Sequence, residues 1–531
     1  MKQPRWIQTI VFLIFGIIVL LPILFMVFGS FWADGQLSLS SYRELLFDKR
    51  QIGLIKNSFG LSFGATLLSL AIGVPLAFLS AKTNLWGRKL LGIAYLIPIL
   101  IPPYMHAIVW THLLSKNGLI NQCIAQLFSL KETPFDIYGI PGAIFVLTLA
   151  YFPFVTLLTA SGLRSIDRRM EEASLLHHGP WKTIKGITLP LIAPHILCGA
   201  LFVFIFSVIN FGVPDILRLR VYPLEVFIQF SAYYNEKAAM ALSLPLVGLT
   251  LLLVALQKWY MKDRSYVNLA SGFEETRLYH LGQLQGLACI FAFTILFLSV
   301  VTPIGVLLKV AGPISTYVKV LETSKTQIGY SIVLALIGGF SMACLAFFIS
   351  YFIERTANRA AKTVVEFATL IPFAIPATVL GIGMIKVWNR PITDVIYGSS
   401  LIIILGYVAH FIPFTTRVTS SALKQVNPRL EEMAFLVTAN WFKVIGKIVL
   451  PLIRPGLLAA FFIGFILSVG DLGTTLLIMP PGKTTLPVKI YNLMHYGAEQ
   501  MVAALCLVLI GIILVFSGTF YMAYKKVTKT N

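Results

Sequence analysis

Charged side chains are scarce in this chain. Only 12% of its 531 residues are Asp, Glu, Lys or Arg, whereas 57% are hydrophobic. A soluble domain carries roughly a quarter charged residues, so this composition excludes an ordinary soluble domain. Apolar runs of about 20 residues recur instead, and each is long enough to cross a bilayer core of about 30 Å. Because backbone groups in hydrocarbon must pair internally, we predict an all-α polytopic membrane protein.

Cysteine is also rare, and the motifs of metal sites and of ATP hydrolysis are missing from the sequence. The five cysteines are scattered, and no CxxC or Cys/His spacing occurs. No GxxxxGK[ST] phosphate loop occurs either, since "PGKTT" from Pro481 lacks the upstream glycine. No combination of nucleophile and base stands out. We therefore predict no metal site, no bound cofactor and no catalytic residue in this chain.

The net charge of +20 might point to nucleic acid, but no basic stripe with interleaved aromatic residues occurs. Lys and Arg lie mostly in short loops on alternate sides of the apolar runs, as topology signals do. Most of the 42 Lys and Arg fall on the cytoplasmic side if the N-terminus is cytoplasmic. We predict that both termini are cytoplasmic. The first run, near Trp6, is longer than a signal-peptide core and lacks a cleavage site, so we interpret it as a retained span.

About twelve spans are predicted. They lie near 7–32, 54–80, 89–115, 140–163, 191–214, 239–261, 281–308, 327–353, 364–388, 399–423, 453–478 and 500–524. Pro and polar residues interrupt the third and ninth spans, which membrane helices tolerate where neighbouring helices satisfy the freed backbone groups.

Four short sequences recur in the same order in the two halves of the chain. "AYLIPILIPPY" from Ala94 matches "ATLIPFAIPAT" from Ala368, "YFPF" from Tyr151 matches "FIPF" from Phe411, "LRSIDRRMEEA" matches "LKQVNPRLEEM", and "ITLPLIAP" from Ile187 matches "IVLPLIRP" from Ile448. Six spans per half restore the same orientation, so we predict two parallel six-helix repeats related by a pseudo-twofold axis along the membrane normal. The predicted domains are a first half at 1–257, a cytoplasmic linker at 258–281 and a second half at 282–531.

Each half carries a charged loop between its fourth and fifth spans. In the first loop, about 164–190, Arg168 to Leu176 is predicted to form a short helix. Gly179 and Pro180 break it, because Pro is acceptable at the start of the next helix. Trp181 to Thr188 then form a second short helix.

The second loop, about 424–451, repeats this plan. Asn440 takes the breaking position, and Trp441 with Phe442 supplies the aromatic group. Both loops resemble the cytoplasmic loop of binding-protein-dependent ABC importer permeases, whose pattern is Glu-Ala-Ala, a Gly a few residues later, and Ile-x-Leu-Pro. The matching residues are Glu172-Ala173-Ser174, Gly179 and Ile187-Thr188-Leu189-Pro190 in the first loop, and Glu432-Met433-Ala434 and Ile448-Val449-Leu450-Pro451, without the Gly, in the second.

The position of the key glutamate in the first loop stays open. Counting back from Pro190 puts it at Glu171, whereas the upstream flank puts it at Glu172. The difference arises because one residue is missing from the first loop. Both glutamates therefore remain candidates.

The resemblance covers nearly the whole chain and implies the type I ABC importer permease fold in a bacterial cytoplasmic (inner) membrane. In that family the first short helix, the coupling helix, docks into a groove on a separate ATPase subunit. The resemblance therefore implies two ATPase copies at the cytoplasmic face, which would bind ATP and Mg, and an extracellular or periplasmic substrate-binding protein. The implied coupling residues are Glu171, Glu172, Ala173, Gly179, Pro180, Trp181, Leu189 and Pro190, with Glu431, Glu432, Ala434, Trp441, Leu450 and Pro451.

The two loops have an alternative interpretation that requires no protein partner. Each could be an amphipathic segment that lies on anionic lipid, held by lysines such as Lys182 and Lys443. Two copies at equivalent positions favour the docking interpretation.

The substrate is the least defined part of the prediction. "NFGVP" from Asn210 and the stretch from Gly470 to Gly497 resemble the ferric-iron importer permeases, and related fused permeases serve thiamine, aminoethylphosphonate and other phosphorylated small molecules. Polar residues at matched depths in the fifth and eleventh spans are candidates for the substrate pathway: Ser207, Asn210, Ser468 and Asp471. A carboxylate within a span usually faces a cavity or a partner, so Asp471 can line the passage or contact the end of a half-helix.

Other polar residues have less specific interpretations. His106, His112 and His410 are interpreted as buried histidines rather than metal ligands. External charges are either docking contacts for the binding protein or a solvated loop: Arg218, Arg220, Glu225, Lys483 and Lys489.

Two other classes of protein share some features with this sequence. An ion-coupled secondary transporter also has twelve spans in two halves, but it needs no docking loop and usually shows intramembrane carboxylate relays. Apart from Asp471, the sequence shows few such carboxylates. A membrane-embedded enzyme lacks support from any reactive constellation.

Overall fold

The protein is described by a computed structural model that covers residues 4–33, 36–37, 42, 49–130, 132–261, 278–438 and 440–529. These residues are almost entirely helical, apart from a short antiparallel pair of strands, β1 (Trp32–Ala33) and β2 (Gln36–Leu37). Ten helices in the described part of the chain are long and apolar enough to cross a membrane. The number rises to twelve if each of two bent helix pairs is one span, which agrees with the predicted all-α polytopic fold.

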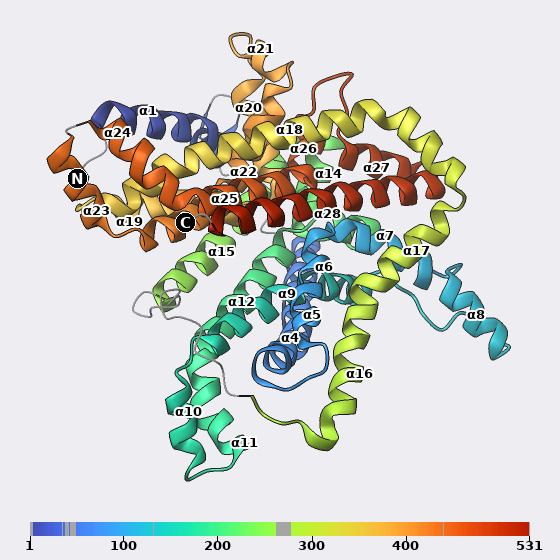
Figure 1. The fold of residues 1–531 in the computed structure, drawn as a ribbon. Helices are drawn as coiled ribbons and strands as arrows, with labels where there is room; N and C mark the ends of the chain where they lie inside the picture. The colour runs from blue at the N-terminus through green and yellow to red at the C-terminus, as the bar shows by residue number, and fades with distance from the viewer. Residues whose placement is uncertain are drawn as a thin grey trace. The chain divides into compact units, whose positions relative to one another are not determined.

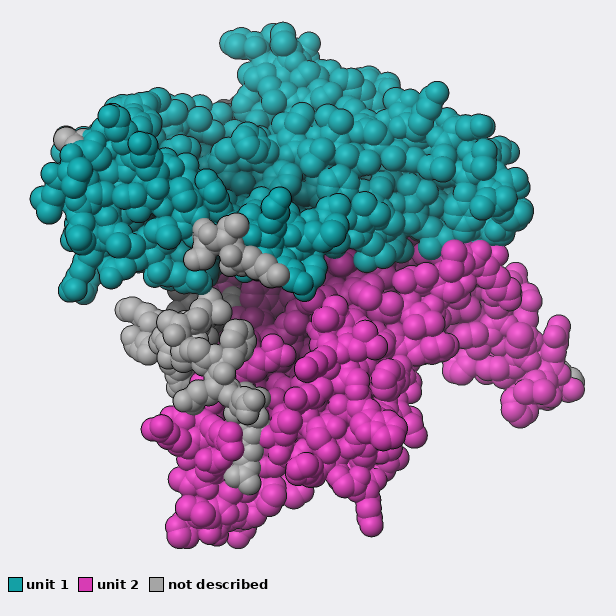
Figure 2. Space-filling model, viewed as in Figure 1, with its two compact units in different colours: residues 1–45, 226–247, 310–531 teal, residues 46–225, 248–309 magenta. Residues whose placement is uncertain are grey.

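The chain divides into two compact units, shown in different colours in Figure 2. Unit 2 comprises residues 46–225 and 248–309, and unit 1 comprises residues 1–45, 226–247 and 310–531. The helices that lie in unit 2 are α4 (Lys49–Lys82), α5 (Arg88–Ala94), α6 (Ile97–Leu100), α7 (Pro103–Leu114), α8 (Leu119–Leu127), α9 (Ile140–Arg164), α10 (Arg168–Leu175), α11 (Pro180–Thr183), η2 (Ile184–Thr188), α12 (Leu189–Ile209), α13 (Gly212–Ile216), η3 (Gly282–Leu284), α16 (Gln285–Leu296) and η4 (Phe297–Val301).

Unit 1 is built mainly from the second part of the chain. Its helices are α1 (Arg5–Phe15), η1 (Gly16–Leu20), α2 (Leu21–Gly29), α18 (Ile314–Arg355), α19 (Arg359–Leu370), η5 (Ile371–Ala374), α20 (Ala377–Trp388), α21 (Asp394–Tyr397), α22 (Leu401–Gln425), α23 (Pro428–Val437), α24 (Trp441–Val444), η6 (Ile445–Val449), α25 (Leu450–Val469), α26 (Gly473–Ile478), α27 (Leu486–His495) and α28 (Glu499–Lys529). Three further helices cross a unit boundary: α14 (Tyr222–Ser231), α15 (Glu236–Met261) and α17 (Thr302–Ala311).

Each unit has the same core of three packed helices. In unit 2, α4 packs against α9 and α12, and in unit 1, α18 packs against α22 and α25 (Figure 1). These are the second, fourth and fifth spans of each predicted repeat. The internal duplication read from the sequence therefore has a counterpart in the packing of the two units.

The first helix of each repeat belongs to the unit formed by the other repeat. In unit 1, α2 packs on α20 so closely that a Cβ on Gly383 would lie 2.5 Å from the carbonyl oxygen of Pro22. In unit 2, Tyr95 donates a hydrogen bond of 3.2 Å to the carbonyl of Ala292 in α16. The compact units and the sequence halves at 1–257 and 282–531 are thus different divisions of the chain.

The third and ninth spans are broken in the middle, where their prolines lie. The segment Arg88–Leu100 meets Pro103–Leu127 at 92°, and Arg359–Ala374 meets Ala377–Trp388 at 107°. Pro lacks a backbone N–H and clashes with the preceding turn, so the prolines at each bend, Pro98, Pro102 and Pro103 in the first and Pro372 and Pro376 in the second, turn the chain here. The interruption predicted from the sequence is therefore a sharp bend.

The fifth and eleventh spans end earlier than the predicted 191–214 and 453–478. Their helices end at Ile209 and Val469, and a short half-helix, α13 or α26, follows each break. The predicted ends were wrong because hydrophobicity continues through the break and conceals it.

Four five-residue π-helical segments share one cause. Each of η1, η2, η4 and η6 ends two residues before a proline: Pro22, Pro190, Pro303 and Pro451. In each, the residue before the proline donates its N–H to the carbonyl five positions back. The wider turn separates the proline ring from the preceding turn, with which it would clash in an α-helix.

Candidate functional site

The two Glu-Glu loops have the same local structure. Asp167 caps α10 by accepting a 2.9 Å hydrogen bond from the N–H of Arg169, and Asn427 caps α23 by accepting one of 3.0 Å from Arg429. Side chains of this type stabilise a helix N-terminus because they pair its free N–H groups. Glu171 lies four residues after the first cap, and Glu431 lies four residues after the second. The structure therefore pairs Glu171, rather than Glu172, with Glu431.

Glu171 is fully buried and holds the first loop to the end of α4. Its Oε2 accepts a 2.7 Å bond from Nζ of Lys82, and its Oε1 accepts a 2.9 Å bond from Oγ1 of Thr188. The Lys82 side chain is only 1% exposed. A buried ion pair is tolerated when both charges are paired and hydrogen-bonded, as here. Glu171 thus joins α4, α10 and the π segment η2.

Glu431 is buried in the same way, but its partners differ. It accepts bonds of 2.8 Å from the hydroxyl of Tyr351 and of 2.7 Å from Nε of Arg355, both near the end of α18. Nη2 of Arg355 also donates to the carbonyls of Leu423 and Val426, at 3.3 and 3.1 Å. The second loop is therefore joined to α18 and to the end of α22.

The second glutamate of each pair faces outward. Glu172 forms an ion pair of 2.7 Å with Arg168 one turn away on α10, and Glu432 is exposed. Ala173 is exposed and Ala434 is half-buried on the same short helices. These positions present polar and small side chains to whatever covers the loop.

The break between the two short helices is where the loops differ in length. Gly179 and Asn440 both occupy the N-cap position of the second helix, and Asn440 accepts a 3.2 Å bond from the N–H of Lys443. The asparagine thus replaces the glycine that the sequence motif lacks. Pro180 starts α11, and the leucine–proline pairs that end each motif start the long helices α12 and α25: Leu189, Pro190, Leu450 and Pro451.

Trp181 and Trp441 are not structural equivalents, although their positions in the sequence of the two loops indicate that they are. Trp181 is 82% exposed, whereas Trp441 is 8% exposed and meets the Tyr351 ring edge-on at 5.8 Å. Phe442, at 57% exposed, is the counterpart of Trp181, since each is the second residue of its short helix. Counting back from the two prolines of the motif would have identified this pair.

An exposed apolar edge borders each loop. Besides the two aromatic side chains, it contains Met170 and Leu176 in the first loop and Leu430, Met433, Leu436 and Val437 in the second. Leu176, Leu436 and Val437 are each more than 80% exposed. Apolar side chains grouped in this way around a polar loop are typical of an interaction surface. Sequence reasoning missed these members, although Met170, Leu430 and Met433 lie beside charged residues, a pattern that could have identified them.

The candidate pathway residues lie at equivalent places in the two repeats. Asn210 accepts a 3.0 Å bond from the N–H of Val213 and donates one of 3.1 Å to the hydroxyl of Tyr151. Asp471 accepts bonds of 3.0 and 2.6 Å from the N–H and hydroxyl of Thr475. Each residue therefore caps the half-helix that follows its break. Ser207 and Ser468 are buried one turn earlier.

His410 is the nearest other polar group to Asp471. Its Nδ1 lies 3.7 Å from Asp471 Oδ1 and 3.1 Å from Oγ1 of Thr474. Among the described residues, no group of three or more His, Cys, Asp or Glu side chains is placed to hold a metal ion.

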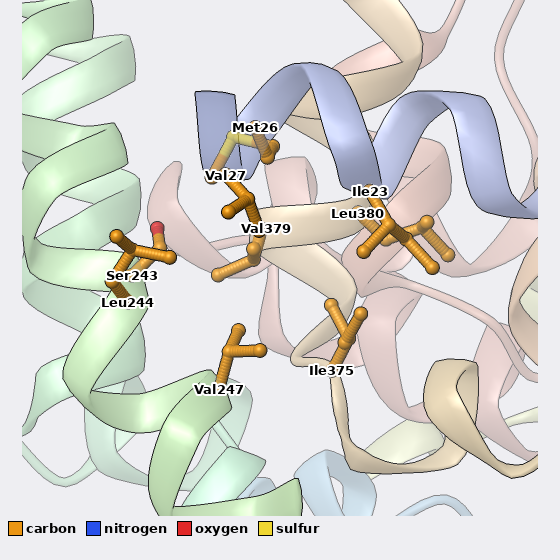
Figure 3. Close-up of a pocket in the computed structure, with 9 residues that line it drawn as sticks. All are labelled: Ile23, Met26, Val27, Ser243, Leu244, Val247, Ile375, Val379 and Leu380. Carbon is orange, nitrogen blue, oxygen red and sulfur yellow. The ribbon is translucent and has the colours of Figure 1, made fainter. Parts of the chain in front are cut away.

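A small cavity lies in unit 1 between α2, α15 and the bend before α20 (Figure 3). It measures about 10 Å³. Its lining is apolar apart from Ser243 and includes Met26, Val247 and Ile375. A cavity of this size holds one water at most, so it cannot accommodate a substrate.

One external candidate contact is buried. Glu225 is 2% exposed and pairs with Nη2 of Arg50 at 2.8 Å. Lys489 donates to the carbonyl of Thr323 at 2.9 Å and to Oε1 of Gln327 at 3.2 Å. Burial also lowers the pKa of Lys489. Because Glu225 is buried and paired with Arg50, it joins α14 to α4 instead of facing a partner.

Comparison with known proteins connects these loops to a family. The family model described as "Binding-protein-dependent transport system inner membrane component" matches twice, at residues 73–266 and 336–528. Each match contains one complete Glu-Glu loop and the basic residue that pairs with its buried glutamate.

Several curated proteins are similar to the chain over most of its length. "Fe(3+)-transport system permease protein FbpB 2" of Haemophilus influenzae is 23% identical over 99% of both chains. "Ferric transport system permease protein FbpB" of Actinobacillus pleuropneumoniae is 24% identical over 88% of this chain and 71% of its own length. "Thiamine transport system permease protein ThiP" of Brucella abortus is 27% identical over 84% of this chain and 82% of its own.

Proposed function

This chain belongs to the family of binding-protein-dependent transport system inner membrane components, and from that premise we propose that its two Glu-Glu loops receive the motion of separate ATPase subunits. It is a fused, duplicated permease of the type I fold and a multi-pass protein of the inner membrane. The observation that carries the proposal is the paired architecture of the loops. Each has a buried glutamate fixed to the membrane bundle and an apolar edge open to a partner.

The loops are suited to transmit force. A docked subunit would grip the exposed edge around Trp181 or Phe442, because a large aromatic side chain can anchor in an apolar pocket. The buried ion pairs of Glu171 and Glu431 would pass that displacement to α4 and α18. These helices are at the centre of the two bundles, so movement of a loop would move a bundle.

We place both loops and both termini on the cytoplasmic side. The excess of Lys and Arg on that side supports this orientation. Two ATPase copies would bind there, one at each loop, and would supply the bound ATP and Mg that this chain has no phosphate loop to hold. The role of this chain is transport, without catalytic residues of its own.

Ferric iron is the proposed substrate, delivered by an external binding protein. Support comes from the relative of Haemophilus influenzae, which spans 99% of both chains and is named for Fe(3+) transport. Fe(III) prefers oxygen ligands, and the described residues group no three candidate ligands together. Capture is therefore assigned to the binding protein and passage to this chain. Thiamine is the alternative that the ThiP relatives support, and 2-aminoethylphosphonate is the alternative that the PhnU relative supports.

The substrate can be tested with proteoliposomes that contain this chain, its ATPase and its binding protein. We expect binding protein loaded with Fe(III) to stimulate ATP hydrolysis and iron uptake, and binding protein supplied with thiamine or aminoethylphosphonate to leave both at the basal rate. Stimulation by either organic substrate alone would reject the iron assignment and keep the transport function.

The double variant Trp181→Ala and Phe442→Ala is expected to weaken association with the ATPase. Losing a well-packed aromatic anchor costs more than about 1–2 kcal/mol at an interface, so we expect at least a tenfold loss of affinity for two anchors. Co-purification of the ATPase with the detergent-solubilised chain measures it. Tyr234→Ala, at an equally exposed aromatic residue outside the loops (84% exposed), is the matched control. Equal loss in the control would contradict docking at the loops.

A further inference from the structure

The C-terminal end of the linker reaches the base of the first loop. Tyr279 forms a parallel bridge with Thr83, just beyond the end of α4. The N–H of Tyr279 donates to the carbonyl of Lys82 at 2.7 Å, and the N–H of Asn84 donates to the carbonyl of Tyr279 at 3.3 Å. The end of the linker, just before the second repeat, is therefore bonded directly to the turn that ends α4.

Asn84 contributes most of the side-chain contacts at this junction. Its Oδ1 accepts a 3.0 Å bond from the N–H of Leu281, and its Nδ2 lies 3.3 Å from Nδ1 of His280. Its carbonyl also accepts a 3.3 Å bond from Nε2 of Gln285, the first residue of α16. One asparagine thus uses its side chain and its backbone to hold two residues at the end of the linker and the first residue of α16.

Apolar packing supports the same junction. The Tyr279 ring lies 5.8 Å from the ring of Phe78 on α4. Leu281 packs against a buried cluster that includes Leu76, Leu85 and Phe152. The segment is therefore seated on the bundle of unit 2 before α16 begins.

Lys82 connects this junction to the first loop. Its carbonyl accepts the bond from Tyr279, and its Nζ forms the buried ion pair with Glu171. Thr83 beside it is fully buried, and its Oγ1 donates to the carbonyl of Leu79 at 2.6 Å. Fixing the backbone of Lys82 therefore fixes the point to which Glu171 is attached.

The corresponding turn of the second repeat is built differently. Arg355 takes the place of Lys82, and its guanidinium is bonded to two carbonyls at the end of α22. Three residues later, Asn358 caps α19 by accepting a 3.1 Å bond from the N–H of Ala361. An asparagine follows each turn. Asn84 is bonded to the segment Leu278 to Gln285, whereas Asn358 is bonded to its own helix.

We propose that Leu278 to Gln285 and Lys82 to Leu85 form a clamp that positions the first coupling loop under control of the second repeat. Asn84 is its central positioning residue. This segment leads directly into α16 of the second repeat, so a displacement of α16 would reach Glu171 through one residue, Lys82. Among the described residues, this hydrogen-bonded clamp holds the first loop, whereas the second loop meets the first repeat through the rings of Trp6 and Phe442, whose centroids lie 6.1 Å apart. The proposal rests on the proposed function, since it assigns regulation to one of the two loops.

The test is the ratio of substrate transported to ATP hydrolysed in proteoliposomes with the ATPase and the loaded binding protein. Asn84→Ala removes two side-chain contacts of the clamp and leaves the Lys82–Glu171 pair in place. We expect the ratio to fall about threefold or more, because a hydrogen bond is worth a several-fold change in an equilibrium. Asn84→Asp keeps the acceptor for Leu281 and should restore most of the ratio. Asn358→Ala, the matched control in the other turn, should leave the ratio unchanged.

Hydrogen exchange of the purified chain tests the clamp without the ATPase. Asn84→Ala should speed exchange in residues 278–285 and 79–88, and also in residues 168–176, which contain Glu171. An unchanged ratio, or faster exchange that stops at the clamp without reaching 168–176, would overturn the proposal. Failure of the wild-type chain to bind an ATPase would instead reject the proposed function, while the exchange result would still report on the clamp.

Discussion

Transport is expected to fall to background when Glu171 and Glu431 are both replaced by alanine, while the chain still inserts into the membrane. Each replacement leaves a buried cation, Lys82 or Arg355, without its carboxylate. Removing one partner of a buried ion pair destabilises a structure by about 3–5 kcal/mol. That energy is confined to the attachment of two short loops, so the loops should detach while the bundles stay folded. Uptake by proteoliposomes, with membrane content measured in parallel, checks the result.

The neighbouring glutamates provide the control for this experiment. Glu172 is half-buried at the surface and its partner lies on the same helix, and such surface pairs contribute only about 0–1 kcal/mol. The double variant Glu172→Ala and Glu432→Ala should therefore retain most of the transport. Loss in this control combined with tolerance at Glu171 and Glu431 would show that the outward-facing carboxylates are the ones that couple.

A compensating variant separates lost charge from lost contact. Glu171→Leu alone leaves Lys82 buried and unpaired, whereas Glu171→Leu with Lys82→Met removes both charges. Replacing both members of a buried ion pair with apolar residues is often neutral. The double variant should thus recover the thermal stability that the single variant loses. It should recover less of the transport, because the bond between α10 and α4 is still missing.

The sequence was sufficient to predict the features that depend on local chemistry. Hydrophobic length predicts the number of spans, prolines predict where the third and ninth spans bend, and Gly179 with Pro180 predicts the break between the two short helices of the first loop. The repeat follows from the same local patterns, because equivalent helices carry equivalent prolines. In each case the cause lies within a few residues of the effect.

The upstream flank of the first loop already aligns Glu171 with Glu431 and Glu172 with Glu432, and the two capped helices have this register. The burial of Glu171, by contrast, could not be predicted from the sequence. It depends on Lys82, which is 89 residues away in the chain and enters the loop only after α4 packs on α9. The burial of Trp441 likewise depends on the Tyr351 ring, from another helix. Nor does any local pattern show that the first helix of each repeat packs with the other repeat. These features are set by tertiary packing, which one sequence does not display.

Asp471 is interpreted either as a cap of α26 or as a residue of the substrate pathway, and the two interpretations predict opposite results for one substitution. As a cap of α26, it needs an oxygen that accepts from Thr475, and asparagine supplies one. The first repeat already uses an asparagine, Asn210, at the equivalent place. Asp471→Asn should therefore keep transport close to that of the wild type.

Asp471→Ala should instead lose transport by about tenfold. It leaves the buried N–H of Thr475 without its acceptor, which costs about 1–3 kcal/mol. A difference of 1.4 kcal/mol is a factor of about ten in an equilibrium. Iron uptake by the two variants at equal membrane content gives the comparison. Equal loss in Asp471→Asn would mean that the negative charge itself is required. A helix terminus needs only a hydrogen-bond acceptor, whereas a cation in transit responds to charge. Asp471 would then be a residue of the proposed iron pathway rather than a cap.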